Sequence, residues 1–359
     1  MFDLDIISKE FEKEIKDIKR DDKVLILTHV DSDGVSSGAI LYKVLKSIGY
    51  INLDIIFPSK GENGYSEGVK NRIKEKKVDY LFILDLGSYK TNFDNVKKII
   101  LIDHHRPEGV PHDGVLFSSF PPPPYISTSY LTFLILKKMN LNPKDYIGLI
   151  GQVGDYGTEY DAPKIDELFK KYKKKEISYV SSLVNSARRV KYFDIETSLN
   201  YLIESENFSD LLVDSENKKR LIEYKEIVKN DIDKWKKTKP KFIKNVAIIE
   251  INSQNLIHPV IAQIWRNVLE KYIIICANFG YIEGKVSFSM RTSLNISLLD
   301  FLRNFLEPNI EEDLGFGHER ATGGIVSIEK WNEFINKISN SNFEVTRWVL
   351  FKKKSLMKL

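Results

Sequence analysis

Three short stretches of this 359-residue chain place acidic and imidazole side chains directly after apolar runs. They are His29-Val-Asp31-Ser-Asp33, Asp85 and Asp103-His104-His105. Each apolar run has the composition of a buried strand, and open parallel sheets bind ligands beyond the carboxyl ends of their strands. We therefore expect these side chains to converge in one crevice. Carboxylates mixed with imidazoles suit Mn²⁺, Mg²⁺ or Zn²⁺, and a pair of such ions is suited to phosphoester hydrolysis.

The spacing of the first motif predicts how its side chains are presented. In an extended segment alternate side chains share one face, so His29, Asp31 and Asp33 would point into the same crevice. Gly34 would then let the chain turn into a helix, whose free N–H groups could receive an anion such as phosphate. Asp85 ends a strand expected near the centre of the sheet. An unpaired carboxylate there would cost several kcal/mol if desolvated, which predicts a cation beside it.

Each of these residues also has a purely structural interpretation. Asp31 or Asp33 could cap a helix, His104 could be a core histidine with satisfied hydrogen bonds, and Asp155, in a Gly-Asp-Tyr-Gly stretch, could be a turn residue. If all these interpretations were purely structural, four separate segments would have placed such residues at the ends of strands or helices by chance. We therefore favour the metal site.

Composition narrows the class of protein. The net charge of +4 is compatible with a nucleic-acid partner without indicating one, because phosphate contact needs a clustered basic patch. A single cysteine, Cys276, excludes an internal disulfide and a cysteine-based metal cage. No apolar run approaches the roughly 18 residues of a membrane span, and the N-terminus lacks the pattern of a signal peptide. We expect a cytoplasmic protein without a membrane partner.

Alternating strand and helix patterns predict an α/β fold whose first domain is a doubly wound parallel sheet. The expected elements are strand 23–29, helix 34–48, strand 51–57, helix 66–77, strand 80–86 and strand 98–103. A helix over 6–19 precedes them. Helices over 127–139 and 143–154 follow a stiff loop of four prolines at 121–124.

The rest of the chain predicts a helical connector and a second, smaller α/β domain. The connector is rich in Lys and Glu and includes a long helix from about 215 to 237. The second domain is expected to contain strands 245–251, 272–278, 284–291 and 325–328 and helices 258–270, 297–306 and 329–339, with a tight glycine loop before the last strand. The predicted boundaries are 1–162 for the first domain, 163–240 for the connector, 241–345 for the second domain and 346–359 for a basic tail.

These motifs resemble those of the DHH phosphoesterase superfamily, and within it the RecJ-like single-strand-specific exonucleases of archaeal type. The matching stretches are His29-x-Asp31-x-Asp33-Gly34, Asp85, Asp103-His104-His105 and Gly154-Asp155. Further on, Phe316-Gly317-His318-Glu-Arg-Ala321-Thr-Gly323 is similar to the Gly-Gly-His-x-x-Ala-x-Gly motif of the companion DHHA1 domain, with Phe316 in place of the first glycine. The resemblance implies a DHH catalytic domain, the connector and a DHHA1 substrate-binding domain.

Finer matches favour RecJ-like nucleases over the shorter oligonucleotide phosphodiesterases. Asn185-Ser-Ala187-Arg188-Arg189 resembles an Asn-Ala-Ala-Gly-Arg block of RecJ, with Arg188 where glycine is usual. The connector's Asn217-Lys-Lys-Arg220 and the stretch around His258-Pro259 have counterparts there as well. Little chain follows residue 345, so we expect the archaeal RecJ-like proteins to be the closer comparison.

The resemblance assigns two divalent ions, with Mn²⁺ favoured and Mg²⁺ as the alternative. It implies that His29, Asp31 and Asp85 hold one ion, and that Asp33, Asp85, His104 and Asp155 hold the other. Asp85 would bridge the two ions and Asp103 would orient its neighbours. His105 would contact phosphate or stabilise the transition state, and a hydrogen bond to Asp103 is its structural alternative.

The second domain and the connector should bind the substrate. Arg291 could clamp a phosphate with two guanidinium donors, although an arginine considered alone more often forms a surface salt bridge. The remaining expected contacts come from the glycine-histidine loop, from the two adjacent arginines and from a base-stacking tyrosine. They are Gly317, His318, Gly323 and Gly324; Arg188 and Arg189; and one of Tyr156, Tyr160 and Tyr192. His258 could instead cap the helix that begins at Pro259.

The expected function is a metal-dependent exonuclease for single-stranded DNA, with RNA as the alternative substrate, in DNA repair or replication. A phosphodiesterase for short oligonucleotides or cyclic dinucleotides would use the same two domains. A pyrophosphatase is disfavoured, because members of that kind lack the glycine-histidine loop. A scaffold in a replication or repair complex is the alternative outside enzymes, and here every expected ligand is present. Expected partners are single-stranded nucleic acid and replication or repair proteins such as GINS-like factors or a helicase.

Overall fold

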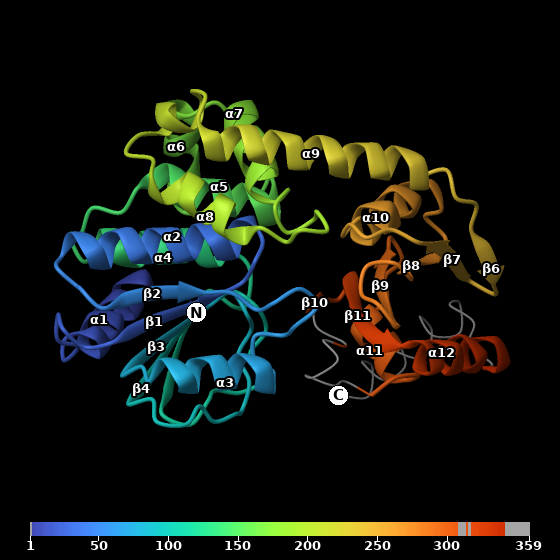
Figure 1. Cartoon of the computed structure of the whole chain (residues 1–359), viewed down its shortest axis with the longest axis horizontal. Helices are drawn as coiled ribbons and strands as arrows, with labels where there is room; N and C mark the ends of the chain where they lie inside the picture. The colour runs from blue at the N-terminus through green and yellow to red at the C-terminus, as the bar shows by residue number, and fades with distance from the viewer. Residues whose placement is uncertain (1, 308–313, 315–316, 342–359) are drawn as a thin grey trace. The chain divides into compact units, whose positions relative to one another are not determined.

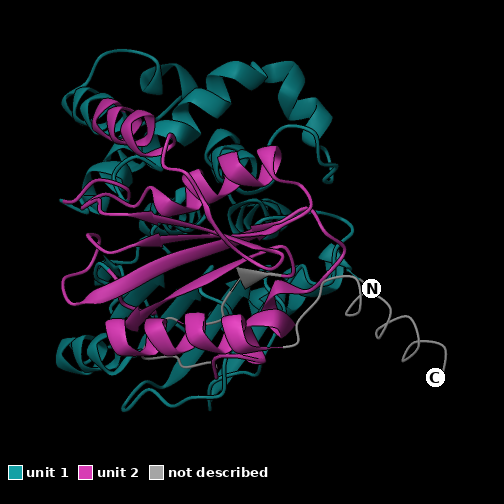
Figure 2. Cartoon of the chain, turned by 90° about the vertical axis from the view of Figure 1, so that its right-hand side faces the viewer, with its two compact units in different colours: residues 1–60, 64–188, 192–225 teal, residues 61–63, 189–191, 226–359 magenta. Residues whose placement is uncertain are grey.

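The computed structural model describes residues 2–307, 314 and 317–341, and the chain divides into two compact units. Unit 1 comprises residues 1–60, 64–188 and 192–225, and unit 2 comprises residues 61–63, 189–191 and 226–359 (Figure 2). The division falls inside the long helix α9 (Glu216–Trp235). The four-part domain division expected from the sequence stays a prediction.

Unit 1 contains a five-stranded parallel sheet, which confirms the expected doubly wound fold (Figure 1). In spatial order the strands are β2 (Leu53–Ile56), β1 (Val24–Thr28), β3 (Tyr80–Leu84), β4 (Lys98–Asp103) and β5 (Gly114–Ser118). The central strands β1, β3 and β4 are buried almost throughout. Burial on both faces explains why these strands are continuous apolar runs rather than alternating patterns.

Helices cover both faces of this sheet. The chain leaves β1 for β2 on one side and returns past β1 to β3, so right-handed crossovers place α2 (Ser32–Ser47) and α3 (Glu67–Lys76) on opposite faces. Helix α2 packs against α4 (Thr128–Lys138) and α5 (Asp145–Tyr156). The strand order reverses between β1 and β3, and such a switch point is where open α/β sheets bind ligands.

The remaining helices of unit 1 surround this layer. They are α1 (Leu4–Ile15), α6 (Ile165–Lys171), α7 (Lys174–Val184), α8 (Ile195–Ile203), the 3₁₀ turn η1 (Phe208–Leu211) and the first half of α9. Helices α7 and α8 both pack against α2. Strand β5 was missed by the sequence analysis, because it is a short, half-buried strand at the edge of the sheet.

In its described part, unit 2 has a six-stranded mixed sheet. The spatial order is β10 (Gly317–His318), β11 (Ala321–Ser327), β9 (Lys285–Thr292), β8 (Ile273–Asn278), β7 (Val246–Ile251) and β6 (Lys241–Ile243). Only β7 and β8 pair in parallel among these strands. The accompanying helices are α10 (His258–Val268), α11 (Leu298–Arg303) and α12 (Ile328–Asn340). Trp331 and Phe334 of α12 pack on Phe288 of β9 to form the core.

Two expectations for unit 2 were wrong. Edge strand β6 was missed because its three residues are mostly exposed. Strand β11 begins at Ala321, so Gly323 and Gly324 lie within it rather than in a tight loop. The pairing with β9 explains the glycine, because a Cβ on Gly323 would lie 2.2 Å from the carbonyl oxygen of Phe288. The expectations for Phe316 and for the basic tail fall outside the described residues.

Candidate metal centre

All six predicted ligands lie at the switch point of the unit 1 sheet. Among the residues that the structure describes, three sets could each hold a metal ion, and some residues belong to two sets. Within each set, the donor atoms all lie within 4.8 Å of one another. The sets are His29, Asp31 and Asp85; Asp85, His104 and His105; and Asp33, His104 and Asp155. The first set is the one expected for the first ion. The set expected for the second ion is distributed over the other two, which have His104 in common, and Asp85 links the first of these to the set of the first ion.

The local structure around Asp31 differs from the expectation. Residues 29–33 are not one extended segment, because α2 already begins at Ser32 with Asp31 as its N-cap. Asp31 Oδ1 accepts hydrogen bonds from the backbone N–H groups of Asp33 and Gly34, both at 3.1 Å. Its Oδ2 lies 3.1 Å from His29 Nδ1. One carboxylate therefore caps the helix with one oxygen and faces His29 with the other, so the N-cap role leaves the second oxygen available to an ion.

Gly34 also has another role than the expected turn. It lies in the first turn of α2, where a Cβ would stand 2.4 Å from the carbonyl oxygen of His29. Glycine at this position lets the helix begin directly against the end of β1. This close approach brings Asp33, in the same turn, towards the crevice.

Asp33 is fully buried, and the start of α4 surrounds its carboxylate with hydrogen-bond donors. Ser127 Oγ (2.7 Å) and the Ser129 N–H (2.9 Å) donate to Oδ1, and the Thr128 N–H (2.8 Å) donates to Oδ2. Burial, together with the nearby carboxylate of Asp85, raises the pKa of Asp33 well above its ordinary value. A bound cation would relieve this accumulation of negative charge. This Ser-Thr-Ser turn was not among the expected site residues, although such residues before an apolar run are a helix-start signal.

Asp85 is the centre of the arrangement. It is 3% exposed and adopts a left-handed backbone conformation with φ of 61°, which costs free energy in a non-glycine residue and is often found at functional sites. Its Oδ1 accepts a hydrogen bond from Thr128 Oγ1 at 2.9 Å and lies 3.4 Å from His104 Nε2. Burial alone would raise the pKa of Asp85. The nearby imidazole nitrogens of His104 and His29 favour its charged form and outweigh burial, so the pKa of Asp85 lies well below its ordinary value.

His29 tests whether the site fits a cation. Its buried Nδ1 atom makes no well-formed hydrogen bond with any described residue, although Asp31 and Asp85 carboxylate oxygens lie 3.1 and 3.6 Å away. Burial by itself lowers the pKa of His29, but these two carboxylates raise it to about 10. The two carboxylates stabilise a positive charge at this nitrogen. A metal ion bound there can supply that charge in place of the proton. The residues therefore fit a divalent cation.

His104 is held from both sides of its ring. Its Nε2 lies 3.1 Å from Asp155 Oδ2, on the crevice side, and its Nδ1 lies 2.8 Å from the hydroxyl oxygen of Tyr156. Burial lowers the pKa of His104, and Asp155 and Asp85 raise it well above the ordinary value. If Nε2 binds the ion, Nδ1 carries the ring hydrogen and would donate it to the hydroxyl oxygen of Tyr156, which would fix the ring orientation. The sequence analysis considered Tyr156 only as a base-stacking residue.

Asp103 and His105 form a supporting pair. Asp103 Oδ1 accepts a hydrogen bond from the His105 backbone N–H (2.6 Å) and lies 3.0 Å from His105 Nδ1. Its Oδ2 accepts a hydrogen bond from the Gly87 N–H at 2.7 Å. The structural alternative for His105, a hydrogen bond to Asp103, is therefore present. Because the same ring stands 4.0 Å from Asp85 Oδ1, this bond also orients it towards the crevice.

The two adjacent arginines have different surroundings. Arg188 belongs to unit 1, and its Nη1 lies 3.7 Å from Asp31 Oδ2, beside the proposed ligands. Its Nε is buried and has no hydrogen-bond partner in the described part of the chain. Arg189 belongs to unit 2, where its carbonyl oxygen accepts a hydrogen bond from the Leu256 N–H at 2.7 Å. Arg188 is thus positioned to contact an anion at the metal centre.

The candidates of unit 2 lie on neighbouring strands. Arg291 in β9 pairs with Ala321 in β11, and His318 in β10 pairs with the same residue from the other side. The side chain of His318 lies outside the described residues. His258 is the first residue of α10 rather than its cap, because Ile257 is the N-cap. His258 is buried, and burial together with the Arg291 charge lowers its pKa to about 3.

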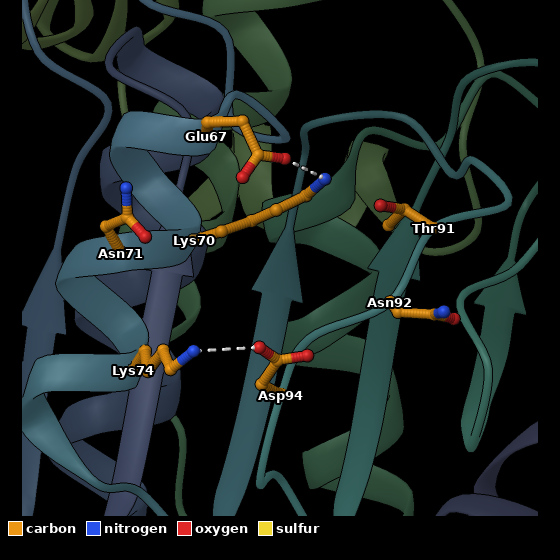
Figure 3. A pocket seen from close by; sticks show the side chains of 7 residues that line it. All are labelled: Glu67, Lys70, Asn71, Lys74, Thr91, Asn92 and Asp94. Carbon is orange, nitrogen blue, oxygen red and sulfur yellow. Dashed lines mark hydrogen bonds and ion pairs between the residues drawn. The ribbon is translucent and has the colours of Figure 1, made fainter.

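A surface hollow of about 440 Å³ lies elsewhere in unit 1, between α3 and the loop after β3 (Figure 3). Its charged groups form two ion pairs, Lys70 with Glu67 at 2.9 Å and Lys74 with Asp94 at 3.1 Å. None of the proposed metal ligands lines it. The acidic groups of this hollow are already neutralised by lysines, which distinguishes it from the metal centre.

Comparisons with known proteins agree with these observations. Residues 23–151 match the sequence profile of the DHH family, N-terminal domain. The single-stranded-DNA-specific exonuclease RecJ of Haemophilus influenzae is 31% identical over 94 residues, which are 24% of this chain and 16% of that protein. The chain thus spans only a small part of the length of this curated relative.

Two solved structures resemble the whole chain. A crystal structure of exonuclease RecJ bound to manganese matches with a TM-score of 0.64 and 16% identity, over 96% of each chain. RecJ from Thermus thermophilus in complex with Mn²⁺ matches with a TM-score of 0.65 and 14% identity, over 94% of this chain and 54% of that chain. At these identities the likeness concerns the fold. For the described residues, no helix is long and apolar enough to cross a membrane.

Proposed function

Because the chain carries the N-terminal domain of the DHH family within a RecJ-like fold, as its motifs predicted, we propose that it is a metal-dependent phosphoesterase. The observation that carries this proposal is the set of three overlapping donor groups around Asp85 and His104. Carboxylates combined with imidazoles favour Mn²⁺, and Mg²⁺ is the alternative. Two such ions stabilise the attacking and the leaving oxygens of an in-line displacement at phosphorus.

The candidate residues would bind the two ions and the phosphate of the substrate. His29, Asp31 and Asp85 would hold one ion, and Asp33, Asp85, His104 and Asp155 the other. Asp103 holds His105 by the hydrogen bond at its Nδ1, so that His105 can contact the phosphate. Arg188, beside Asp31, would bind a neighbouring non-bridging phosphate oxygen.

The substrate that we propose is single-stranded DNA, with RNA as the alternative, cleaved from an end in DNA repair or replication. The RecJ-like fold over nearly the whole chain and the identity to a single-stranded-DNA-specific exonuclease support this choice. In unit 2, the proposed phosphate contacts are Arg291, Gly317, His318, Gly323 and Gly324, with Arg189 along the bound strand. Replication or repair proteins, such as GINS-like factors or a helicase, remain proposed partners.

The test is hydrolysis of single-stranded oligonucleotides of several lengths, labelled at the 5′ or the 3′ end, with Mn²⁺, Mg²⁺ or EDTA. We expect metal-dependent ladders on long strands with wild type and none with Asp85→Asn, which keeps the volume of the side chain but removes its charge. Asp94→Asn is the matched control, because Asp94 lies in the lysine-paired hollow. Cleavage confined to di- to pentanucleotides would reassign the protein as a short-oligonucleotide phosphodiesterase. Absence of all hydrolysis would refute the enzyme and favour a scaffold.

A further inference from the structure

Three tyrosines of unit 1 form a cluster beside the metal centre. Tyr125 precedes α4, Tyr156 is the last residue of α5, and Tyr160 follows it in the next turn. Their ring centroids are 4.9 Å (Tyr125 to Tyr160), 5.6 Å (Tyr125 to Tyr156) and 5.8 Å (Tyr156 to Tyr160) apart. We call these three residues the tyrosine cluster. The cluster begins next to two proposed ligands, since Tyr156 follows Asp155 and contacts His104.

Two of the three tyrosines are held by hydrogen bonds, Tyr156 through its side chain and Tyr125 through its backbone. Tyr156 is bound through its hydroxyl to His104 Nδ1 at 2.8 Å, and the two rings meet edge to face with centroids 5.6 Å apart. The backbone of Tyr125 is held on both sides, by its N–H to the carbonyl oxygen of Asp161 (3.3 Å) and by its carbonyl oxygen to Gln152 Nε2 (2.7 Å). These contacts give the third ring a rigid support.

Tyr160, by contrast, remains 48% exposed although its ring lies against the rings of Tyr125 and Tyr156. A cluster that served only to pack the loop would bury its largest rings. Its charged neighbours Glu159 and Asp161 are exposed carboxylates, and Lys174, 3.8 Å from Glu159, offsets only part of their charge. Such surroundings repel a phosphate and suit an uncharged ring. An aromatic ring that is supported from behind is the usual platform for a base.

We propose that Tyr160 is a nucleobase-stacking residue that receives the base of a nucleotide near the scissile phosphate. The proposal deepens the proposed function and rests on it, because it needs a nucleic-acid strand at the metal centre. Since every base has a π-face, stacking here makes binding tolerant of sequence. By the usual effect of removing such a ring, Tyr160→Ala should weaken strand binding about five- to a hundred-fold.

The test compares a strand with bases to a strand without them. Fluorescence anisotropy measures the binding of a labelled oligothymidylate and of an abasic strand of equal length, with Ca²⁺ in place of Mn²⁺. Tyr160→Ala should lose affinity for the oligothymidylate only, whereas Tyr160→Phe, which keeps the ring, should bind both strands like wild type. Tyr179→Ala is the matched control, because Tyr179 on α7 is also partly exposed, at 39%, and lies outside the cluster.

The outcomes separate this proposal from the function on which it rests. Equal losses for both strands, or no loss for either, would overturn stacking at Tyr160. If wild type hydrolyses strands in Mn²⁺ while stacking fails, only the stacking proposal falls. A base-dependent loss without hydrolysis by wild type would instead retain the stacking site and refute the phosphoesterase. Failure of wild type to bind either strand would overturn both.

Discussion

Two histidines, one in each unit, stand in opposite electrostatic surroundings. Near His29 the carboxylates of Asp31 and Asp85 overcome burial and raise the pKa to about 10. Around His258, burial and the positive charge of Arg291 lower the pKa to about 3. The first region has more negative charge than the protein itself neutralises, and the second has a cation beside a buried neutral ring. A metal ion in unit 1 and a phosphate in unit 2 are the ligands that this difference favours.

The largest effect should come from removing the central negative charge of the first region. At a free Mn²⁺ concentration 100 times its Kd, binding should stabilise unit 1 by about 2.7 kcal/mol, or about 5–10 °C in Tm for a unit of this size. Asp85→Asn should abolish most of this shift, because it removes a ligand shared by two donor sets. Scanning calorimetry with Mn²⁺ and with EDTA measures it. An equal Mn²⁺ shift in Asp85→Asn would remove the basis for a metal centre, and Asp94→Asn should keep the full shift.

A second prediction concerns the support of His104. Tyr156→Phe deletes the hydroxyl at 2.8 Å from His104 Nδ1 and should weaken Mn²⁺ affinity about 10–100-fold, as losses of such supporting contacts usually do. Isothermal titration with Mn²⁺ in the absence of substrate gives the affinity directly. Tyr146→Phe is the control, since its hydroxyl is also buried and hydrogen-bonded, but to Ser205. Unchanged affinity in Tyr156→Phe would show that the ring contact alone orients His104.

A third prediction probes the second region. Arg291→Ala should weaken the binding of a single-stranded oligonucleotide about tenfold, which corresponds to the loss of one charge-assisted contact of about 1.5 kcal/mol. It should leave Mn²⁺ affinity unchanged, because all the proposed ligands belong to unit 1. Arg266→Ala on α10 provides the control, since Arg266 contacts only its neighbour Asn267 among the contacts found in the described part. Equal losses in both variants would indicate general charge attraction rather than a clamp at Arg291.

The grouping of most candidate ligands could be predicted because His29, Asp85 and His104 directly follow strands. Apolar runs identified β1, β3 and β4, and the rule for parallel sheets then brought their carboxyl ends together. The N-cap role of Asp31 could also be predicted, since aspartate before a helix is a common start signal. The extended segment expected over residues 29–33 was nevertheless wrong, because the helix begins at Ser32. Local patterns therefore located the donors better than they described their backbone.

Other features depend on contacts between distant parts of the chain. Ser127 donates to Asp33 across 94 residues of sequence, and Tyr156 reaches His104 across 52. The positive φ of Asp85 is not indicated by the apolar run that precedes it. Gly323 suggested a loop, because glycine is common in turns, whereas here it permits close pairing of β11 with β9. No periodicity or motif encodes such contacts.

The smallest effect, at about 1.4 kcal/mol per pH unit, should appear in the pH dependence of unit 2. The folded pKa of His258, about 3, lies below its unfolded value of roughly 6.5. The contribution of this group to stability is therefore fully present above pH 6.5. Between pH 6.5 and 3, His258 is protonated in the unfolded chain but neutral in the folded chain, so the folded state loses stability as the pH falls. Wild type should lose about 1.4 kcal/mol per pH unit through this group below pH 6.5, whereas His258→Asn should lack that part of the slope. Urea unfolding followed by tryptophan fluorescence reports on unit 2, because the tryptophans among the described residues, Trp235, Trp265 and Trp331, belong to it. Parallel stability curves between pH 7.5 and 5 would mean that His258 takes up a proton in the folded state, and the contrast with His29 would then disappear.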